Sequence, residues 1–153
     1  MNLEHILTDR RILLHQDAKD WRAAIRLAAQ PLLQEGCFDA AYIEAMIQIV
    51  EEFGAYVVIA KGVALAHARP EDGVHHGGLS VMTLKTPVEF GNPENDPVSV
   101  VFCLATEDET SHLEVIRSLV SLIDDPAKIR SLAEAKDLKA FRLQLAKANG
   151  KVA

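Results

Sequence analysis

The sequence has little of what several large classes of protein depend on. Its 153 residues include only two cysteines, so neither a disulfide framework nor a C-x-x-C redox site is indicated. Its longest apolar stretches, such as residues 98–105, are far shorter than the roughly 20 residues that cross a bilayer. Lys and Arg number 16 against 22 Asp and Glu, a net charge of −6. Because phosphate backbones are bound by clustered basic residues, we expect no nucleic-acid partner.

The amino-terminal residues, MNLEHILTDRR, also lack the apolar segment of a secretory signal. Cys37 follows Gly36, where a helix is predicted to end, and Cys103 lies in an apolar, strand-like run. Both thiols are therefore predicted to be reduced and mostly buried, in a cytoplasmic protein. The length predicts a single domain over residues 1–153, and 49% hydrophobic residues are enough for a sizeable core.

Two amphipathic helices are predicted in the first third of the chain. Asp17 is expected to cap the first, which Gly36 ends and whose last turn Pro31 kinks or loosens. Asp39 is expected to cap the second, which ends at Gly54. Each helix has one apolar face, so each needs another layer of structure to pack against.

The middle of the chain changes to β-type runs, at residues 56–59, 63–65, 79–84 and 98–105. These runs are continuously apolar rather than alternating, which is typical of strands covered on both faces. The segment 86–97 is rich in proline and asparagine and is predicted to be an ordered loop.

The last third is predicted to be helical again. The S-x-x-E sequence at residues 111–114 has the form of a capping box at a helix start. Further helices are predicted over residues 126–133 and 137–146. Helices, then strands, then helices indicate one α/β domain, with a central mixed β-sheet flanked by helices on both faces.

Several kinds of active site lack their sequence signals. We find no G-x-x-x-x-G-K-[ST] loop for nucleotide phosphates, and no Ser or Cys nucleophile with its base and orienting acid. The central histidines do not have the spacing of a zinc site, so no metal is expected: His67, His75, His76 and His112.

Two of the six histidines follow predicted strands. His67 comes directly after an apolar strand, and His112 lies at the start of a helix that follows another. Ligands collect at the carboxyl ends of strands in α/β sheets, so the two rings are candidates for one shared site. In the other interpretation, each ring only bonds a loop carbonyl. The remaining four are assigned structural or solvated roles or are weak candidates: His5, His15, His75 and His76.

A histidine in such a place can act as a covalent nucleophile. An ordinary imidazole pKa of about 6.5 leaves the ring largely neutral near pH 7, with a nitrogen lone pair free to accept a phosphoryl group. The predicted helix start at residues 111–114 offers amides and a positive dipole end to the incoming anion. Glu114 and the acidic segment 106–110 oppose that attraction.

Three segments carry a resemblance to a known family: GAYVVIAKGVALAHARPEDGV at residues 54–74, LSVMTLKTPVEFGNPENDPVSVVFCLA at 79–105, and SHLEV at 111–115. Together they resemble the IIA component of bacterial sugar phosphotransferase systems, in the ascorbate-type branch of the mannitol/fructose-type fold class. The similarity runs from about Asp17 through the C-terminal helices.

The resemblance implies a phosphoryl carrier. His67 would be the phosphorylated nucleophile, and His112 the partner that holds the phosphoryl oxygens. The donor would be the histidine phosphocarrier protein, and the acceptor a cysteine of a IIB protein or domain. A membrane IIC component would complete the uptake of ascorbate or a related sugar. The family implies no metal and no dissociable cofactor.

The chain departs from the family where prolines are common, at Ala55, Lys61 and Ala66. Because proline fixes φ near −65°, its loss beside His67 is expected to loosen the backbone there without removing the nucleophile. Arg69 has two open roles, in docking or phosphate electrostatics and in a surface ion pair. A shallow apolar rim around His67 is expected from Leu65, Ala66 and Val74.

Two other functions stay open at this point. One is a regulatory interaction module with the same fold that passes no phosphoryl group to a transporter. The other is a metal buffer that uses the histidines. The first would have no dedicated IIB and IIC partners, and the second would be stabilised by zinc.

Overall fold

The centre of the protein is a five-stranded mixed sheet. The structure, a computed structural model, describes residues 2–148. The strands are β1 (Ile12–Gln16), β2 (Val58–Ala60), β3 (Val63–Ala66), β4 (Gly78–Val88) and β5 (Val98–Ala105), in the order β1-β4-β5-β3-β2. β4 and β5 are antiparallel, as are β2 and β3, whereas β1 runs parallel to β4 and β3 runs parallel to β5. The predicted mixed sheet is confirmed.

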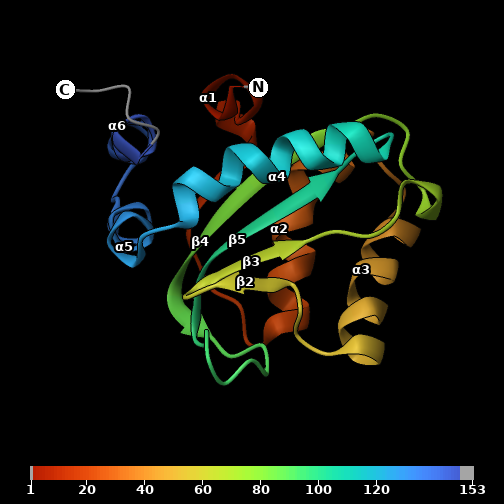
Figure 1. Ribbon diagram of the computed structural model, residues 1–153, viewed down its shortest axis with the longest axis horizontal. Helices are drawn as coiled ribbons and strands as arrows, with labels where there is room; N and C mark the ends of the chain where they lie inside the picture. The colour runs from red at the N-terminus through yellow and green to blue at the C-terminus, as the bar shows by residue number, and fades with distance from the viewer. Residues whose placement is uncertain (1, 149–153) are drawn as a thin grey trace.

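Helices cover both faces of this sheet, also as predicted. They are α1 (Leu3–Ile6), α2 (Trp21–Gln34), α3 (Ala40–Phe53), α4 (Glu109–Ile123), α5 (Pro126–Glu134) and α6 (Leu138–Ala148), with short 3₁₀ turns η1 (Asp9–Arg11) and η2 (Pro70–Asp72). Figure 1 shows α4 crossing in front of the sheet and α2 behind it, with α5 and α6 at one side. None of the helices within residues 2–148 is long and apolar enough to span a bilayer.

The sheet separates two buried clusters, and β3 contributes to both. Ala64 and Ala66 join the cluster under α2 and α3, while Val63 and Leu65 join the cluster under the C-terminal helices. This division follows the period of two with which side chains leave a strand. All four residues of β3 are fully buried, which confirms for this run the prediction of a strand covered on both faces. The prediction is wrong for the run at residues 56–59, because β2 lies at the edge of the sheet, Tyr56 precedes it and is exposed, and Ile59 is exposed as well.

The start of α2 differs from the prediction. Asp20, not Asp17, is the cap, and its carboxylate accepts a hydrogen bond from the amide of Ala23 at 2.8 Å. Asp17 lies three residues too early to reach the free amides of the first turn. Pro31 does not end the helix, which continues to Gln34, because proline in a last turn removes only one intrahelical hydrogen bond.

The predicted order of elements is wrong at the amino terminus, where β1 precedes α2. β1 pairs in parallel with β4 at an edge of the sheet. Its five residues, ILLHQ, include two polar ones, so the run does not resemble a buried strand. β4 is also longer than predicted. It extends to Val88, which pairs with Val98, so the loop between β4 and β5 starts later than the predicted residue 86.

Candidate active site

His67 lies immediately beyond the end of β3. The last residue of that strand, Ala66, pairs with Cys103 of β5, so the strand ladder restrains the backbone on the amino-terminal side of His67. The ring is half-buried, and its Nδ1 lies 2.9 Å from the carbonyl oxygen of Leu65. Because a carbonyl oxygen only accepts, Nδ1 carries a proton, and in the neutral ring this tautomer puts the lone pair on Nε2.

His112 reaches the same edge of the sheet from the first turn of α4. The predicted capping box is wrong: Asp108 is the cap, and its carboxylate accepts from the amide of Ser111 at 2.7 Å. Ser111 therefore lies inside the first turn rather than before it. His112 follows, and its amide donates to the carbonyl oxygen of Asp108 at 3.2 Å.

The two rings converge, as one of the two interpretations of the sequence requires. The ring centroids of His67 and His112 are 5.3 Å apart, with an angle of 48° between the ring planes. The parallel pairing of β3 and β5 causes this, because both chains leave the sheet at the same edge. His67 also bonds a backbone carbonyl, as the other interpretation proposes, but that carbonyl belongs to Leu65 in β3 rather than to a loop.

The surroundings keep His112 neutral. Burial lowers its pKa below the ordinary value, and the neighbouring His67 lowers it further, while Glu109 acts in the opposite direction. Asp108 stays ionised, since its hydrogen bonds to the Ser111 amide and hydroxyl lower the pKa of its carboxyl. The site thus combines an uncharged imidazole with two carboxylates beside it.

A cavity of about 360 Å³ opens over both histidines. Its polar lining comes from Thr106, Asp108, Glu109 and Arg69, and its apolar lining from Ile49, Ala68, Pro70 and Leu113. Leu113 is 56% exposed, so it forms part of an accessible rim.

The rim predicted from the sequence is wrong in its members. Leu65 and Ala66 are fully buried in the two core clusters, and Val74 is half-buried and does not line the cavity. Strand residues point into the core layers, so the rim comes from helices α3 and α4 instead. Ile49 and Leu113 were missed because nothing in the sequence shows that these helices meet at His67.

Arg69 forms a surface ion pair, which is one of the two roles that its sequence position leaves open. Its Nη2 lies 3.3 Å from the Oδ1 of Asp72, and its backbone amide donates to the Oδ2 of Asp72 at 3.0 Å. Those contacts lower the pKa of Asp72. The Arg69 side chain is 71% exposed and also lines the cavity, which leaves its other role open.

The remaining histidines lie outside this cavity. The Nε2 of His75 lies 2.9 Å from the Oδ1 of Asp39, so this carboxylate faces His75 rather than capping α3. The Nε2 of His15 lies 3.2 Å from the carbonyl oxygen of Ala133. Within residues 2–148 we find no group of three His, Cys, Asp or Glu side chains that would hold a metal ion.

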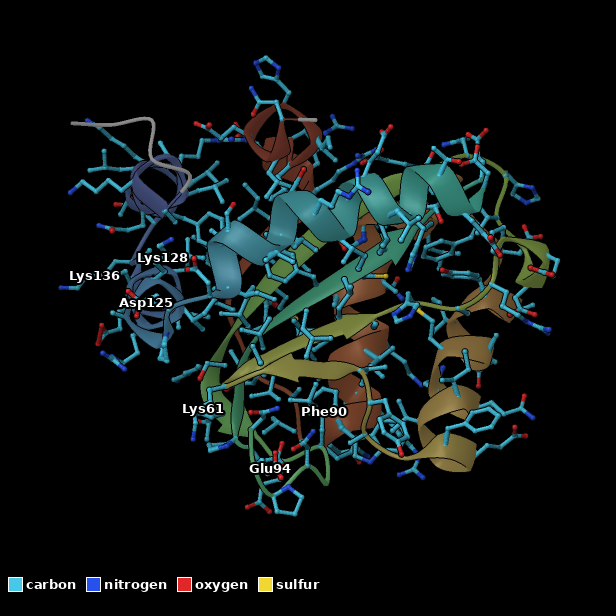
Figure 2. All side chains as sticks on the ribbon, viewed as in Figure 1. Lys61, Phe90, Glu94, Asp125, Lys128 and Lys136 are labelled. Atoms are coloured by element: carbon cyan, nitrogen blue, oxygen red, sulfur yellow. The ribbon has the colours of Figure 1, made fainter. Side chains whose placement is uncertain are left out.

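Lys61, one of the three positions where prolines are common in the family, lies far from His67 and His112. Lys61 is in the turn between β2 and β3, at the end of β3 away from His67, and Figure 2 shows it at that end of the sheet together with Glu94. Both border a different cavity, of about 440 Å³. The residue at position 61 therefore has no direct contact through which to change the backbone at His67.

Comparison with known proteins identifies the family. Residues 5–148 match the family described as "Phosphoenolpyruvate-dependent sugar phosphotransferase system, EIIA 2". This chain belongs to that family. Two relatives of this IIA protein carry the name ascorbate-specific PTS system EIIA component. The one from Escherichia coli K12 is 37% identical over 123 residues, 80% of each chain. The one from Salmonella typhimurium LT2 is 38% identical over 122 residues, 79% of each chain.

Solved structures agree with that assignment. The mannitol-specific cryptic phosphotransferase enzyme IIA CmtB from E. coli has a TM-score of 0.83 and 30% identity, over 99% of this chain and 100% of its own. A complex of the E. coli mannitol IIA enzyme with phosphorylated IIB has a TM-score of 0.78 and 25% identity, over 95% and 98%. This IIA protein is therefore a phosphotransferase component of a sugar phosphotransferase system.

Proposed function

We propose that this IIA protein accepts a phosphoryl group on Nε2 of His67 and passes it to a IIB cysteine. The donor is the histidine phosphocarrier protein, and the pathway takes up ascorbate or a related sugar through a membrane IIC component. One observation carries the proposal: Nδ1 of His67 is bonded to the Leu65 carbonyl, which makes Nε2 the nitrogen with the lone pair in the neutral ring, beside His112. The ascorbate-specific relatives support this class of sugar.

The reaction needs no activating base at His67. The Nε2 lone pair attacks phosphorus, a new N–P bond forms, and the N–P bond of the donor histidine breaks with its electrons returning to the donor ring. In the second step a IIB thiolate attacks the same phosphorus, an S–P bond forms, and His67 leaves as the neutral ring. Throughout, the proton stays on Nδ1, which donates to the Leu65 carbonyl oxygen.

In this proposal His112 binds the phosphoryl group as a neutral donor. Its lowered pKa keeps it uncharged near neutral pH, so it supplies one N–H without a fixed positive charge. Asp108 and Glu109 repel the arriving anion in the same cavity, whereas Arg69, which also lines it and pairs with Asp72, attracts the anion. The two carboxylates favour a phosphohistidine that is transferred readily rather than stored.

The outer surface suits a transient partner. Ile49 and Leu113 offer apolar contact beside the nucleophile, and carboxylates surround them. With a net charge of −6, the protein attracts a partner that presents basic and apolar groups together. A relay partner needs only a small interface, under about 1,200 Å² in total. The solved mannitol IIA–IIB complex supports a IIB protein as one such partner.

Phosphorylation of purified variants tests the nucleophile. With phosphoenolpyruvate, enzyme I and the phosphocarrier protein, the wild type should gain one acid-labile, alkali-stable phosphate. His67→Ala should abolish it, His112→Ala should slow it by roughly tenfold to a hundredfold, and the exposed-site control His75→Ala should leave it unchanged. Phosphate on His112, or none on the wild type, would contradict the assignment.

Transfer onward separates this proposal from the regulatory module. Phosphorylated wild type should lose its label to the IIB protein of an ascorbate-type system, and a IIB variant with Cys→Ser at its acceptor should receive none. A regulatory module would keep its phosphoryl group in the presence of every IIB protein tested, and that result would exclude the relay to a transporter.

A further inference from the structure

Tyr42 of α3 links the two chain segments that carry the histidines. Its side chain is buried, with 1% of its surface exposed. Its hydroxyl bonds the chain just beyond the end of β3 and near the end of β5. The hydroxyl accepts from the amide of Ala68 at 2.9 Å and donates to the carbonyl of Leu104 at 2.7 Å. Its ring stacks on Phe38, with the ring centroids 4.7 Å apart.

The two bonded residues are close in sequence to the active-site segments. Ala68 directly follows His67, and Leu104 lies one residue before the end of β5, from which the chain continues to α4 and His112. Burial raises the pKa of Tyr42, so the phenol stays protonated and both hydrogen bonds persist at physiological pH.

The hydroxyl completes the restraint of the His67 backbone. On one side, the pairing of Ala66 with Cys103 restrains it through the strand ladder. On the other side the ladder has ended, and the Ala68 amide is satisfied by Tyr42 alone. With both sides restrained, the ring keeps its Nδ1 on the Leu65 carbonyl.

We infer that Tyr42 is a positioning residue for phosphoryl transfer, which acts by holding His67 and the β5–α4 segment in register. The inference rests on the proposed function and adds a residue to it. Tyr42 touches no reacting atom. Its effect passes through the backbone amide of Ala68 and the carbonyl of Leu104.

Tyr42→Phe tests the hydroxyl while keeping the ring in the core. In the wild type, phosphate should be on Nε2 only. In Tyr42→Phe, loosening of the segment should place a measurable fraction on Nδ1, which the nitrogen and phosphorus chemical shifts of phosphohistidine distinguish. The rate constant for uptake should fall by roughly tenfold to a hundredfold, since small misplacements are costly. The KM for the phosphocarrier should change by less than about twofold, because the rim is intact.

Thr83→Val is the matched control. Thr83 is fully buried, and its hydroxyl accepts a hydrogen bond from the backbone amide of His15 in β1 at 2.9 Å. This variant also loses one buried hydroxyl, but neither bonded group belongs to a segment that carries His67 or His112. It should lose stability, yet keep the wild-type transfer rate and Nε2 labelling.

The outcomes separate the two claims. If Tyr42→Phe behaves like Thr83→Val in rate and in labelled nitrogen, the positioning role is overturned while labelling of wild-type His67 still stands. If wild-type His67 takes no label, the proposed function fails first. If Tyr42→Phe does not fold, hydrogen exchange of the Ala68 amide in the wild type tests the positioning role instead. The Ala68 amide should be as protected as the β5 amides, and exchange at the rate of an open loop would overturn the inference.

Discussion

A half-buried imidazole beside another imidazole resists protonation, and this is the position of His112. Its folded-state pKa lies below the ordinary value because of burial first and His67 second. The unfolded chain, with a His pKa near 6.5, therefore binds more protons than the folded chain once the pH falls below about 6.5. The contribution of His112 to the free energy of unfolding is therefore fully present above that pH. It is lost as the pH falls toward the lowered folded-state pKa of His112.

His112→Gln should remove this part of the acid sensitivity. Between about pH 6.5 and the lowered folded-state pKa, the urea midpoint of the variant should fall less steeply than that of the wild type. The measurement is a series of urea unfolding curves across this range. The variant His5→Gln, at an exposed site, serves as the control and should follow the wild type. Parallel curves for His112→Gln and the wild type would contradict the account of His112.

Both cysteines should be unreactive in the folded protein. Cys37 and Cys103 are free and fully buried, and burial raises the pKa of Cys103 to about 12, which removes the reactive thiolate. An aromatic disulfide reagent should modify the native protein more than about a hundredfold more slowly than the urea-unfolded chain. Rapid modification of one thiol per chain would show that a core segment opens easily.

At the scale of helices and strands, α2 shows how cap assignment depends on tertiary context. The sequence places two aspartates near the helix start, and periodicity alone does not distinguish them. Asp20→Ala should lower the free energy of unfolding by about 1 kcal/mol, because its carboxylate satisfies the Ala23 amide. Asp17→Ala should change it by less than about 0.5 kcal/mol. Urea unfolding of both variants decides, and equal effects would contradict the assigned cap.

Other elements could be predicted because their signals are local. Gly54 ends α3 with a positive φ of 86°, as the glycine suggests, and β5 has the bounds that its apolar run predicts. β1 could not be found this way, since its short run of three apolar and two polar residues is a strand only because β4 pairs with it. The start of α4 was misplaced because Asp108 competes with the S-x-x-E sequence for the first turn.

Part of the candidate site could likewise be predicted from local sequence, and part of it depends on tertiary packing. The strand-end positions of His67 and His112 predict convergence, because strand direction in a parallel pair decides which edge each chain leaves. The rim of Ile49 and Leu113, and the hydroxyl of Tyr42, depend on how α3 and α4 pack against the sheet. Periodicity marks Tyr42 as a core residue but does not show which backbone groups its oxygen meets.

For the molecule as a whole, charge predicts how the relay responds to salt. With a net charge of −6 and carboxylates beside the nucleophile, association with a basic donor is steered electrostatically. Raising the ionic strength from about 50 mM to about 500 mM should lower the second-order rate constant for phosphate uptake by roughly tenfold. Hydrolysis of the isolated phosphoprotein, which involves no encounter, is the control and should change little. A rate constant that does not change with salt would show that charge plays no part in the encounter.

The parallel pairing of β3 with β5 has a consequence for how this protein diverges from its relatives. Both strands deliver the chain to one edge of the sheet, and the two imidazoles meet there with centroids 5.3 Å apart. That common edge comes from backbone pairing, which side-chain substitutions on the surface leave alone. Ile49 and Leu113 belong to helix surfaces that carry no such constraint. Mutation is therefore free to retune which protein docks here while the chemistry beneath it stays the same.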